Sequence, residues 1–463
     1  MLFNSLEFAF FLPCVLLVYY ALNPRAQNLW LLGASYAFYA AWDWRFLVLI
    51  FLSTCVDYFA ARKISRGEHT KPWLYLSLAF NLGMLGLFKY FNFFVDSFIA
   101  LGATIGMNFD TPVLRLLPPV GISFYTFQTL SYTIDVYRRQ ISPETDFSRF
   151  ALFVSYFPQL VAGPIERAER LLPQIQKRRT VSADLLASGL VLILIGLFKK
   201  VVIADTAGVT VDQIFAAPEE KSSLVLLNGV LLFALQIYGD FSGYSNIARG
   251  VSRLFGIELM ENFKTPYFAQ NVSEFWRRWH ISLSEWLRDY LYIALGGNRA
   301  GRFKTYRNLL TTMVLGGLWH GAAWTFVIWG VLHGLYLVVH RFWRFLRPTP
   351  LSGQLPRALA VVTTFSAISF AWLFFRAEDL SQASLYITGL LSFRGDLELL
   401  QLRKLLVLGL LILPLEWIQY RSNDNVLGLR HCPAIIRLPI YAAMLLGVVL
   451  LSTQDSPFIY FQF

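Results

Sequence analysis

Charged side chains are scarce in this chain. Asp, Glu, Lys and Arg together make up 15% of its 463 residues, whereas soluble domains contain about 25%. Apolar residues make up 56%, and the mean hydropathy is +0.51. Because the shortage of charge runs along the whole chain, it excludes an ordinary soluble protein and predicts lipid as the outer solvent.

Cysteine and the common catalytic motifs are also largely missing. Cys14, Cys55 and Cys432 are odd in number and far apart, so they form neither a disulfide framework nor a metal-ligand spacing. We expect all three to be structural, and we expect no metal site and no bound cofactor. There is no GxSxG elbow, HExxH zinc motif or dinucleotide-binding fingerprint, so hydrolase, metalloprotease and redox functions have no support.

The basic residues that are present fall in short loops between apolar segments. The net charge is +11, which in a soluble protein would suggest nucleic acid. Here the positive charge instead predicts how the chain is oriented in the membrane, because membrane proteins concentrate Lys and Arg in cytoplasmic loops. Residues 62–71, 167–179 and 341–347 are therefore expected on the cytoplasmic side, with no nucleic-acid partner.

Apolar segments recur along the whole chain, and each is a candidate for a crossing of about 20 residues. The chain is expected to be all-α, with about a dozen helices, some of them re-entrant, in a single membrane domain over residues 1–463. Leu6 to Leu22 lacks a basic leader and a cleavage site, so it reads as a first membrane helix. The predicted spans are 6–22, 29–41, 46–61, 73–88, 91–105, 118–136, 147–165, 185–203, 224–238, 309–319, 322–339, 358–375, 402–417 and 438–451.

The stretch from Arg249 to Arg307 has a different composition. It contains ten basic and five acidic residues interleaved with Trp and Tyr. In FWRRWHISLSEWLRDYLYIAL, from Phe275 to Leu295, the apolar positions recur at spacings of three and four. This pattern predicts an amphipathic helix that lies in the interface or dips into a cavity near the cytoplasmic face.

His320 is the only ionisable residue in LGGLWHGAAWTFVIWG. An ionisable residue at membrane depth is a functional candidate. The alternative is a packing histidine in a helix contact made by Gly317 and Gly321. A buried imidazole loses hydration when it is charged, so burial favours the neutral form, which can accept a proton from an attacking hydroxyl.

Other polar residues could complete a site. His280 is the second catalytic candidate, and Arg277, Arg278 and Arg288 face either phosphates or solvent and lipid. Asp240 comes directly after an apolar run. Its carboxylate lies either at a helix end that faces water or in the polar lining of a cavity. His333 and His340 are expected to be structural or interfacial, and the turn from Gly296 to Gly301 is expected to be a tight loop. The tentative substrate-binding or donor-binding residues are Asp240, Trp279, Arg277, Arg278, Arg288, Trp319 and Asn298.

Two blocks carry a family resemblance. They are ENFKTPYFAQNVSEFWRRWHISLSEWLRDYLYIALGGNRAG, residues 261–301, and GGLWHGAAWTFVIWGVLHG, residues 316–334, with PPVGISFYTFQTLSYTIDVYRR, residues 118–139, FPQLVAGPI and GDFSGYS upstream. Over nearly its whole length the chain resembles the membrane-bound O-acyltransferase family. It is most similar to the bacterial branch of alginate O-acetyltransferases and of D-alanyl transfer proteins for teichoic acid. Peptidoglycan and cellulose acetylation proteins share these motifs.

The resemblance implies a ring of tilted helices around a funnel, with a tunnel from a cytoplasmic donor to an acceptor on the far side. It implies His320 as catalytic histidine and His280 as the second family position, often Asn elsewhere. Acetyl-CoA or an acyl carrier would supply the acyl thioester, and an exported polysaccharide of alginate type would receive the acyl group directly or through periplasmic acetyltransferase or polysaccharide-modification proteins. The protein would lie in the bacterial inner membrane, in contact with its lipids.

Two other functions fit the composition. A transporter or flippase also carries ionisable residues and interrupted helices within the membrane. A scaffold that recruits an acyltransferase would pack His320 on all sides. Catalysis instead requires that His320 and His280 line one cavity near mid-membrane.

Overall fold

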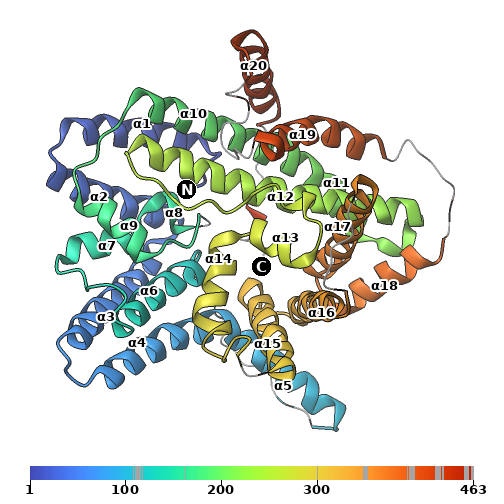
Figure 1. Ribbon diagram of the computed structural model, residues 1–463, viewed down its shortest axis with the longest axis horizontal. Helices are drawn as coiled ribbons and strands as arrows, with labels where there is room; N and C mark the ends of the chain where they lie inside the picture. Colours follow the sequence, from blue (N-terminus) through green and yellow to red (C-terminus); the bar gives the residue numbers. More distant parts are fainter. Residues whose placement is uncertain are drawn as a thin grey trace. The chain divides into compact units, whose positions relative to one another are not determined.

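The computed structural model describes most of the chain (Figure 1). The described residues are 1–107, 109, 116, 118–161, 163–299, 301–347, 353–393, 395, 402–422, 429, 432–452 and 458–459. Within them every regular element is a helix and no strand occurs. The predicted all-α class is confirmed.

Eight helical stretches among the described residues are long and apolar enough to cross a membrane, by length and composition. They are Pro24–Ser65, Thr70–Thr104, Ala183–Ala216, Ser223–Leu254, Trp324–Leu346, Gln354–Arg376, Arg403–Ser422 and Ala434–Leu451. The chain is therefore a multi-pass membrane protein. The number of crossings, the funnel and the tunnel stay predictions.

Two compact units can be distinguished. Unit 1 contains Met1–Leu186 and Val251–Met260, and unit 2 contains Ala187–Gly250 and Glu261–Phe463. Helix α12, Ser223–Leu254, runs from unit 2 into unit 1. The expected single domain over residues 1–463 stays a prediction.

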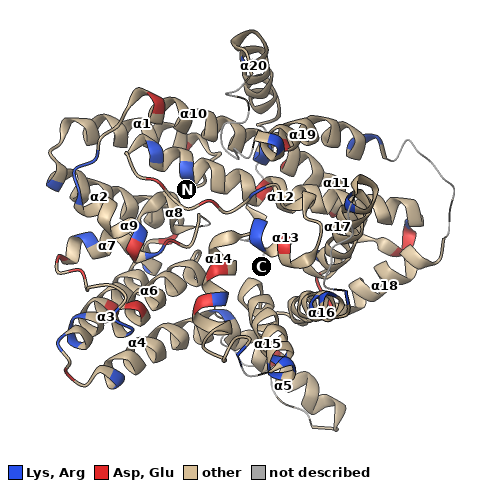
Figure 2. Cartoon of the chain, in the orientation of Figure 1, with Lys and Arg blue, Asp and Glu red and all other residues tan. Residues whose placement is uncertain are grey.

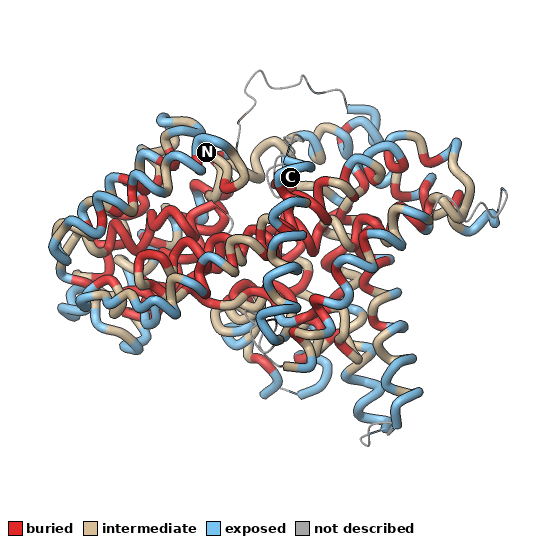
Figure 3. Tube along the Cα trace, turned by 90° about the horizontal axis from the view of Figure 1, so that it is seen from above, coloured by how far each residue is buried: buried red, intermediate tan, exposed pale blue. Residues whose placement is uncertain are grey.

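Unit 1 is built from nine helices of the N-terminal part, α1(Leu6–Ala21), α2(Pro24–Asp43), α3(Leu47–Ser65), α4(Thr70–Leu85), α5(Phe91–Thr104), α6(Ile122–Tyr137), α7(Phe147–Ser155), α8(Phe157–Leu160) and α9(Ala168–Gln176). Helix α6 is buried almost throughout, and α3 and α4 pack against it. The carboxylate of Asp57 on α3 is buried there and accepts hydrogen bonds from Ser77, Asn81 and Thr133. Buried positions concentrate inside the units, and exposed ones lie on outer helix faces (Figure 3).

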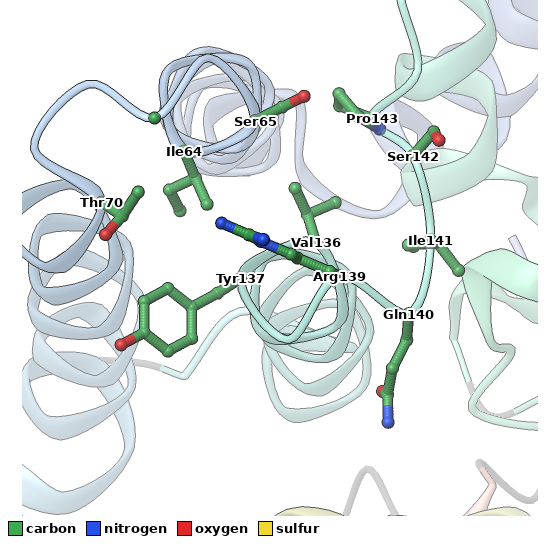
Figure 4. A pocket seen from close by; sticks show the side chains of 11 residues that line it. Ile64, Ser65, Thr70, Val136, Tyr137, Arg139, Gln140, Ile141, Ser142 and Pro143 are labelled. Carbon is green, nitrogen blue, oxygen red and sulfur yellow. The ribbon is translucent and has the colours of Figure 1, made fainter.

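A pocket of about 490 Å³ lies in unit 1, where α3 and α6 end and α4 begins (Figure 4). Ile64, Thr70, Tyr137 and Arg139 are among its lining residues. None of the site residues predicted from the sequence lines it, and all but one of the motif blocks that carry the family resemblance lie beyond it in the chain.

Unit 2 carries the later helices. After α10(Ala183–Leu197), which begins in unit 1, a π-helical segment Phe198–Asp205 leads into α11(Thr206–Ala216). The remaining α-helices are α13(Val272–Arg278), α14(Ile281–Trp286), α15(Arg302–His320), α16(Trp324–Leu346), α17(Gln354–Arg376), α18(Leu380–Leu391), α19(Arg403–Ser422) and α20(Ala434–Leu451). Helices α15 and α16 form a tightly packed antiparallel pair, and α17 packs against α16.

Several predicted span boundaries are wrong. Spans 29–41 and 46–61 join into one helical stretch, because a single turn of 3₁₀ helix at Trp44–Phe46 connects α2 to α3. Span 147–165 is broken instead, since Tyr156 leaves the helical conformation one residue before the four-residue α8. Span 224–238 is too short, because α12 continues to Leu254 through small and polar residues.

The predicted amphipathic helix over Phe275 to Leu295 is also wrong in one respect. Its periodicity is real, but the helix is interrupted at Trp279 and His280, between α13 and α14. A π-helical turn, Leu287–Tyr292, then follows α14. Spacing alone did not reveal the break, because the apolar pattern continues across it.

Candidate active site

His320 is the last residue of α15, and it is 4% exposed. The chain turns at Gly321 and enters α16 at Trp324. A Cβ on Gly317 would collide with the carbonyl oxygen of Phe326, and one on Gly321 would collide with the Phe326 ring. These glycines let the two helices approach closely, so the turn places His320 against the first turns of α16.

His280 lies at the break between α13 and α14 and is fully buried. Its backbone is left-handed, with φ of 42°, which is uncommon for a residue other than glycine. Asn262 holds the segment that follows: its carbonyl accepts the Ile281 N–H at 3.0 Å, and its side-chain oxygen accepts the Ser282 hydroxyl at 2.7 Å. The strained conformation is therefore fixed by hydrogen bonds to a residue outside the helix.

The imidazoles of His280 and His320 lie 6.4 Å apart between ring centroids. The expected proximity of the two histidines is confirmed, whereas a shared cavity stays a prediction. The ring centroid of Phe241 lies 4.6 Å from that of His280, and the two ring planes are nearly perpendicular. Burial lowers the pKa of His280 to about 3, because an imidazolium would lose its hydration there. His280 is therefore neutral at physiological pH.

Trp279 and Trp319, predicted from the sequence, belong to the same aromatic surroundings. The ring of Trp319 is 5.0 Å from His320 and 5.8 Å from His280. Trp279 is buried and stacks on Phe275 with ring centroids 5.5 Å apart. The apolar rings exclude water from the two imidazoles. Electrostatic interactions between either imidazole and a bound group are therefore strong.

Three further aromatic contacts were missed from the sequence. Trp329 and Phe375 lie 5.0 Å and 5.3 Å from His320, and the Nδ1 of His333 accepts a hydrogen bond from the Trp276 indole at 3.3 Å. His333 thus packs in the same cluster, as a structural histidine would. Trp329 and His333 lie four residues apart on α16, and this spacing was the available signal, but an aromatic run in a membrane helix is usually packing.

Asp240 lies inside α12 and not at its end. Its carboxylate pairs with Lys200 at 2.6 Å and accepts the Ile459 N–H at 2.7 Å. Lys200 also pairs with Asp205 at 2.7 Å. The prediction that Asp240 lies at a helix end is therefore wrong. Its carboxylate belongs to a buried ion-pair network, next in sequence to Phe241.

The predicted arginines and Asn298 belong to segments with mixed charge or solvent exposure, and Figure 2 shows both basic and acidic residues on α13. Arg278 pairs with Glu274 at 2.7 Å, and Arg288 pairs with Asp289 at 2.7 Å. The exposed Arg277 donates through Nε to the carbonyl of Ser273 at 3.2 Å. Asn298 is exposed in the glycine-rich turn. These contacts do not involve either histidine, and a role of the four residues in donor binding stays a prediction.

Two buried imidazoles at this separation can take different roles in an acyl transfer. One accepts a proton, and the other donates a hydrogen bond to an oxygen that becomes negative. Among the described residues no three His, Cys, Asp or Glu side chains are grouped as metal ligands.

Comparison with known proteins shows which family the chain belongs to. The sequence model of the membrane-bound O-acyltransferase family matches residues 138–376. The chain is 41% identical to the probable alginate O-acetylase of Pseudomonas putida over the full length of both chains. It is 39% identical to the peptidoglycan O-acetyltransferase of Helicobacter pylori, covering 85% of this chain and 80% of the relative. It is 30% identical to the teichoic acid D-alanyltransferase of Bacillus subtilis, covering 57% and 70% respectively.

Proposed function

Because this chain belongs to the membrane-bound O-acyltransferase family, we propose that it moves an acetyl group from a cytoplasmic thioester to hydroxyl groups of an exported polysaccharide. Relatives named for O-acetylation of alginate and of peptidoglycan support both the acetyl group and the acceptor class. The observation that carries the chemistry is the separation of 6.4 Å between the rings of His280 and His320. These residues come from different helices and are buried together.

His320 is the general base of this proposal. Its neutral imidazole removes the proton from the acceptor hydroxyl while the hydroxyl oxygen attacks the thioester carbonyl carbon. The tetrahedral intermediate then collapses, the carbon–sulfur bond breaks, and the proton passes from His320 to the leaving thiolate. The new ester and the free thiol are the products, so atoms and charge balance.

His280 is the hydrogen-bond donor. A neutral imidazole keeps one N–H, and burial holds His280 in this form. A donor that is fixed before the reaction stabilises the developing oxyanion without reorganisation. The left-handed backbone at His280 and its anchoring through Asn262 supply that fixed position.

The acyl donor and the acceptor lie on opposite sides of the membrane in this proposal. Acetyl-CoA or an acyl carrier approaches from the cytoplasm, where Arg277, Arg278 and Arg288 suit an anionic, phosphate-bearing donor. The protein lies in the bacterial inner membrane. On the far side, the acetyl group reaches the polysaccharide directly or through a periplasmic acetyltransferase or polysaccharide-modification protein.

Purified full-length protein in detergent tests this function, because detergent abolishes any membrane gradient. The donor is a thioester with a radiolabelled acetyl group, and the acceptor is the deacetylated polysaccharide or oligosaccharides from it. We expect thiol release and transfer of label to the acceptor, both dependent on acceptor. If donor, acceptor and the periplasmic partner protein are all supplied and no thiol is released, the protein acts as a transporter or a scaffold instead.

A further inference from the structure

A long part of unit 2 contains no acidic residue. Between Asp289 and Glu378 the sequence has no Asp or Glu, although it contains nine Lys and Arg residues. These residues are Arg299, Arg302, Lys304, Arg307, Arg341, Arg344, Arg347, Arg357 and Arg376. Cations in this stretch have no carboxylate nearby in the sequence to neutralise them.

Several of these cations meet at one place. Helix α15 begins at Arg302, and the antiparallel α16 ends at Leu346. The guanidinium of Arg302 lies 3.6 Å from the centre of the Phe345 ring. The start of α15 and the end of α16 are therefore side by side. We call residues 302–304 together with residues 341–347 the hairpin end.

The hairpin end is exposed throughout, and it combines cations with large apolar groups. Phe303 is 83% exposed, Trp343 is 53% exposed and Leu346 is 56% exposed. Such side chains gain nothing from contact with water, and aromatic residues beside Lys and Arg are typical of the boundary between hydrocarbon and headgroups. This composition fits a lipid surface and not a water-filled loop.

The geometry of Arg302 leaves its hydrogen-bond donors available. A guanidinium that stacks on a ring uses its face, whereas its N–H groups point outward in the plane and match the oxygens of a phosphate. Arg341 and Arg344 are three residues apart on α16, so they occupy one side of that helix. The hairpin end thus presents several cations to one anionic layer.

We propose that the hairpin end binds anionic phospholipid headgroups of the cytoplasmic leaflet, with Arg302 and Arg344 as principal contacts. An anionic surface is complementary in charge to these exposed cations, which have no acidic neighbour in the sequence and lie on helix ends that also carry apolar side chains. Arg302 and His320 are separated by the length of α15, about 27 Å at 1.5 Å per residue. Headgroup binding at the hairpin end is therefore remote from the reacting histidine, and it goes beyond the proposed function.

Lipid binding to the purified full-length protein tests this proposal. Protein in a neutral detergent is titrated with phosphatidylglycerol or with phosphatidylcholine, and bound lipid is read by native mass spectrometry. We expect wild-type protein to prefer phosphatidylglycerol. Arg302→Gln with Arg344→Gln should weaken that preference about fivefold for each cation removed, since one cation near an anionic surface contributes about 1 kcal/mol.

A matched control removes two cations elsewhere. Arg45 pairs with Asp43 at 2.6 Å, and Lys63 pairs with Glu68 at 2.7 Å, so Arg45→Gln with Lys63→Gln changes the net charge equally and should keep the preference. Equal losses in both double variants would reduce the effect to net charge and overturn the proposal. So would displacement of the lipid by millimolar glycerol phosphate, because that result would indicate a site for soluble phosphate. No donor is needed, so failure here is separate from failure of the acyl transfer.

Discussion

The imidazole of His280, at the N-terminal cap of α14, lies 6.4 Å from that of His320, at the end of α15. Forty residues of chain separate them. Two kinds of backbone feature produce the pairing: the left-handed residue that interrupts the amphipathic segment, and the close glycine contacts between α15 and α16. Because His320 is proposed as the general base and His280 as the hydrogen-bond donor, substitutions of the two residues should change the rate of acyl transfer in different ways.

Replacement of His280 should change the rate of acyl transfer as expected for a hydrogen-bond donor and not for a general base. His280→Ala removes the N–H, and loss of one oxyanion donor typically costs about 10² to 10³ in kcat. His280→Asn keeps an N–H and tolerates the left-handed backbone, so it should retain more activity than the alanine variant. Steady-state rates of acyl transfer provide the comparison. Equal rates in the two variants would argue against hydrogen-bond donation.

The pH dependence of turnover should belong to His320 and not to His280. A general base works only when it is unprotonated, so the rate should rise with pH as the base loses its proton. Burial lowers the pKa of His280 to about 3, so deprotonation of this ring does not account for a rise near neutral pH. The rising limb should persist in His280→Asn, and its disappearance there would reverse the two assignments.

The approach of α15 to α16 should not tolerate a larger residue. Gly317→Ala places a methyl group against the Phe326 carbonyl, and overpacking of this kind costs about 1–3 kcal/mol. Gly33→Ala on α2 is the control, because nothing lies within 4 Å of its new Cβ. Thermal unfolding in detergent should show a lower midpoint for Gly317→Ala alone. Similar midpoints in both variants would mean that the contact is looser than described.

A variant without cysteine should keep most of its activity. Cys14, Cys55 and Cys432 are free thiols, and all three lie outside the blocks that contain the two histidines. Replacement of the three by Ser or Ala therefore leaves the proposed chemistry intact. Acyl transfer by the triple variant checks this expectation. Loss of transfer, with normal folding, would point to a thioester on the enzyme.

Composition and hydropathy predicted the membrane class and the helical fold, because scarcity of charge is a property of the whole chain. Boundaries were harder to predict. A single 3₁₀ turn joins α2 to α3 without interrupting the apolar pattern, and a predicted span breaks at Tyr156, two residues before Pro158, whose ring cannot continue a helix. Hydrophobic periodicity records neither feature.

The same limit applies to the site. His320 was recognisable as the lone ionisable residue of an apolar block, and His280 from the resemblance to the family. Asn262, which fixes the backbone after His280, gave no signal, since its hydrogen bonds join residues about twenty positions apart. Asp240 was recognised as unusual, but its partner Lys200 lies forty residues earlier, and sequence spacing does not predict this pair.

Turnover of His320→Ala is the most direct test of the account. The variant is purified in parallel with wild type and with His69→Asn, a change at an exposed histidine far from the motif blocks in the sequence. Each protein receives labelled acyl thioester and acceptor in detergent after its folding has been checked by gel filtration and thermal unfolding. We predict that His69→Asn matches wild type and that His320→Ala, although folded, loses about 10² to 10⁴-fold in turnover, as expected for removal of a general base. Acetylation by folded His320→Ala at the wild-type rate would contradict the assignment.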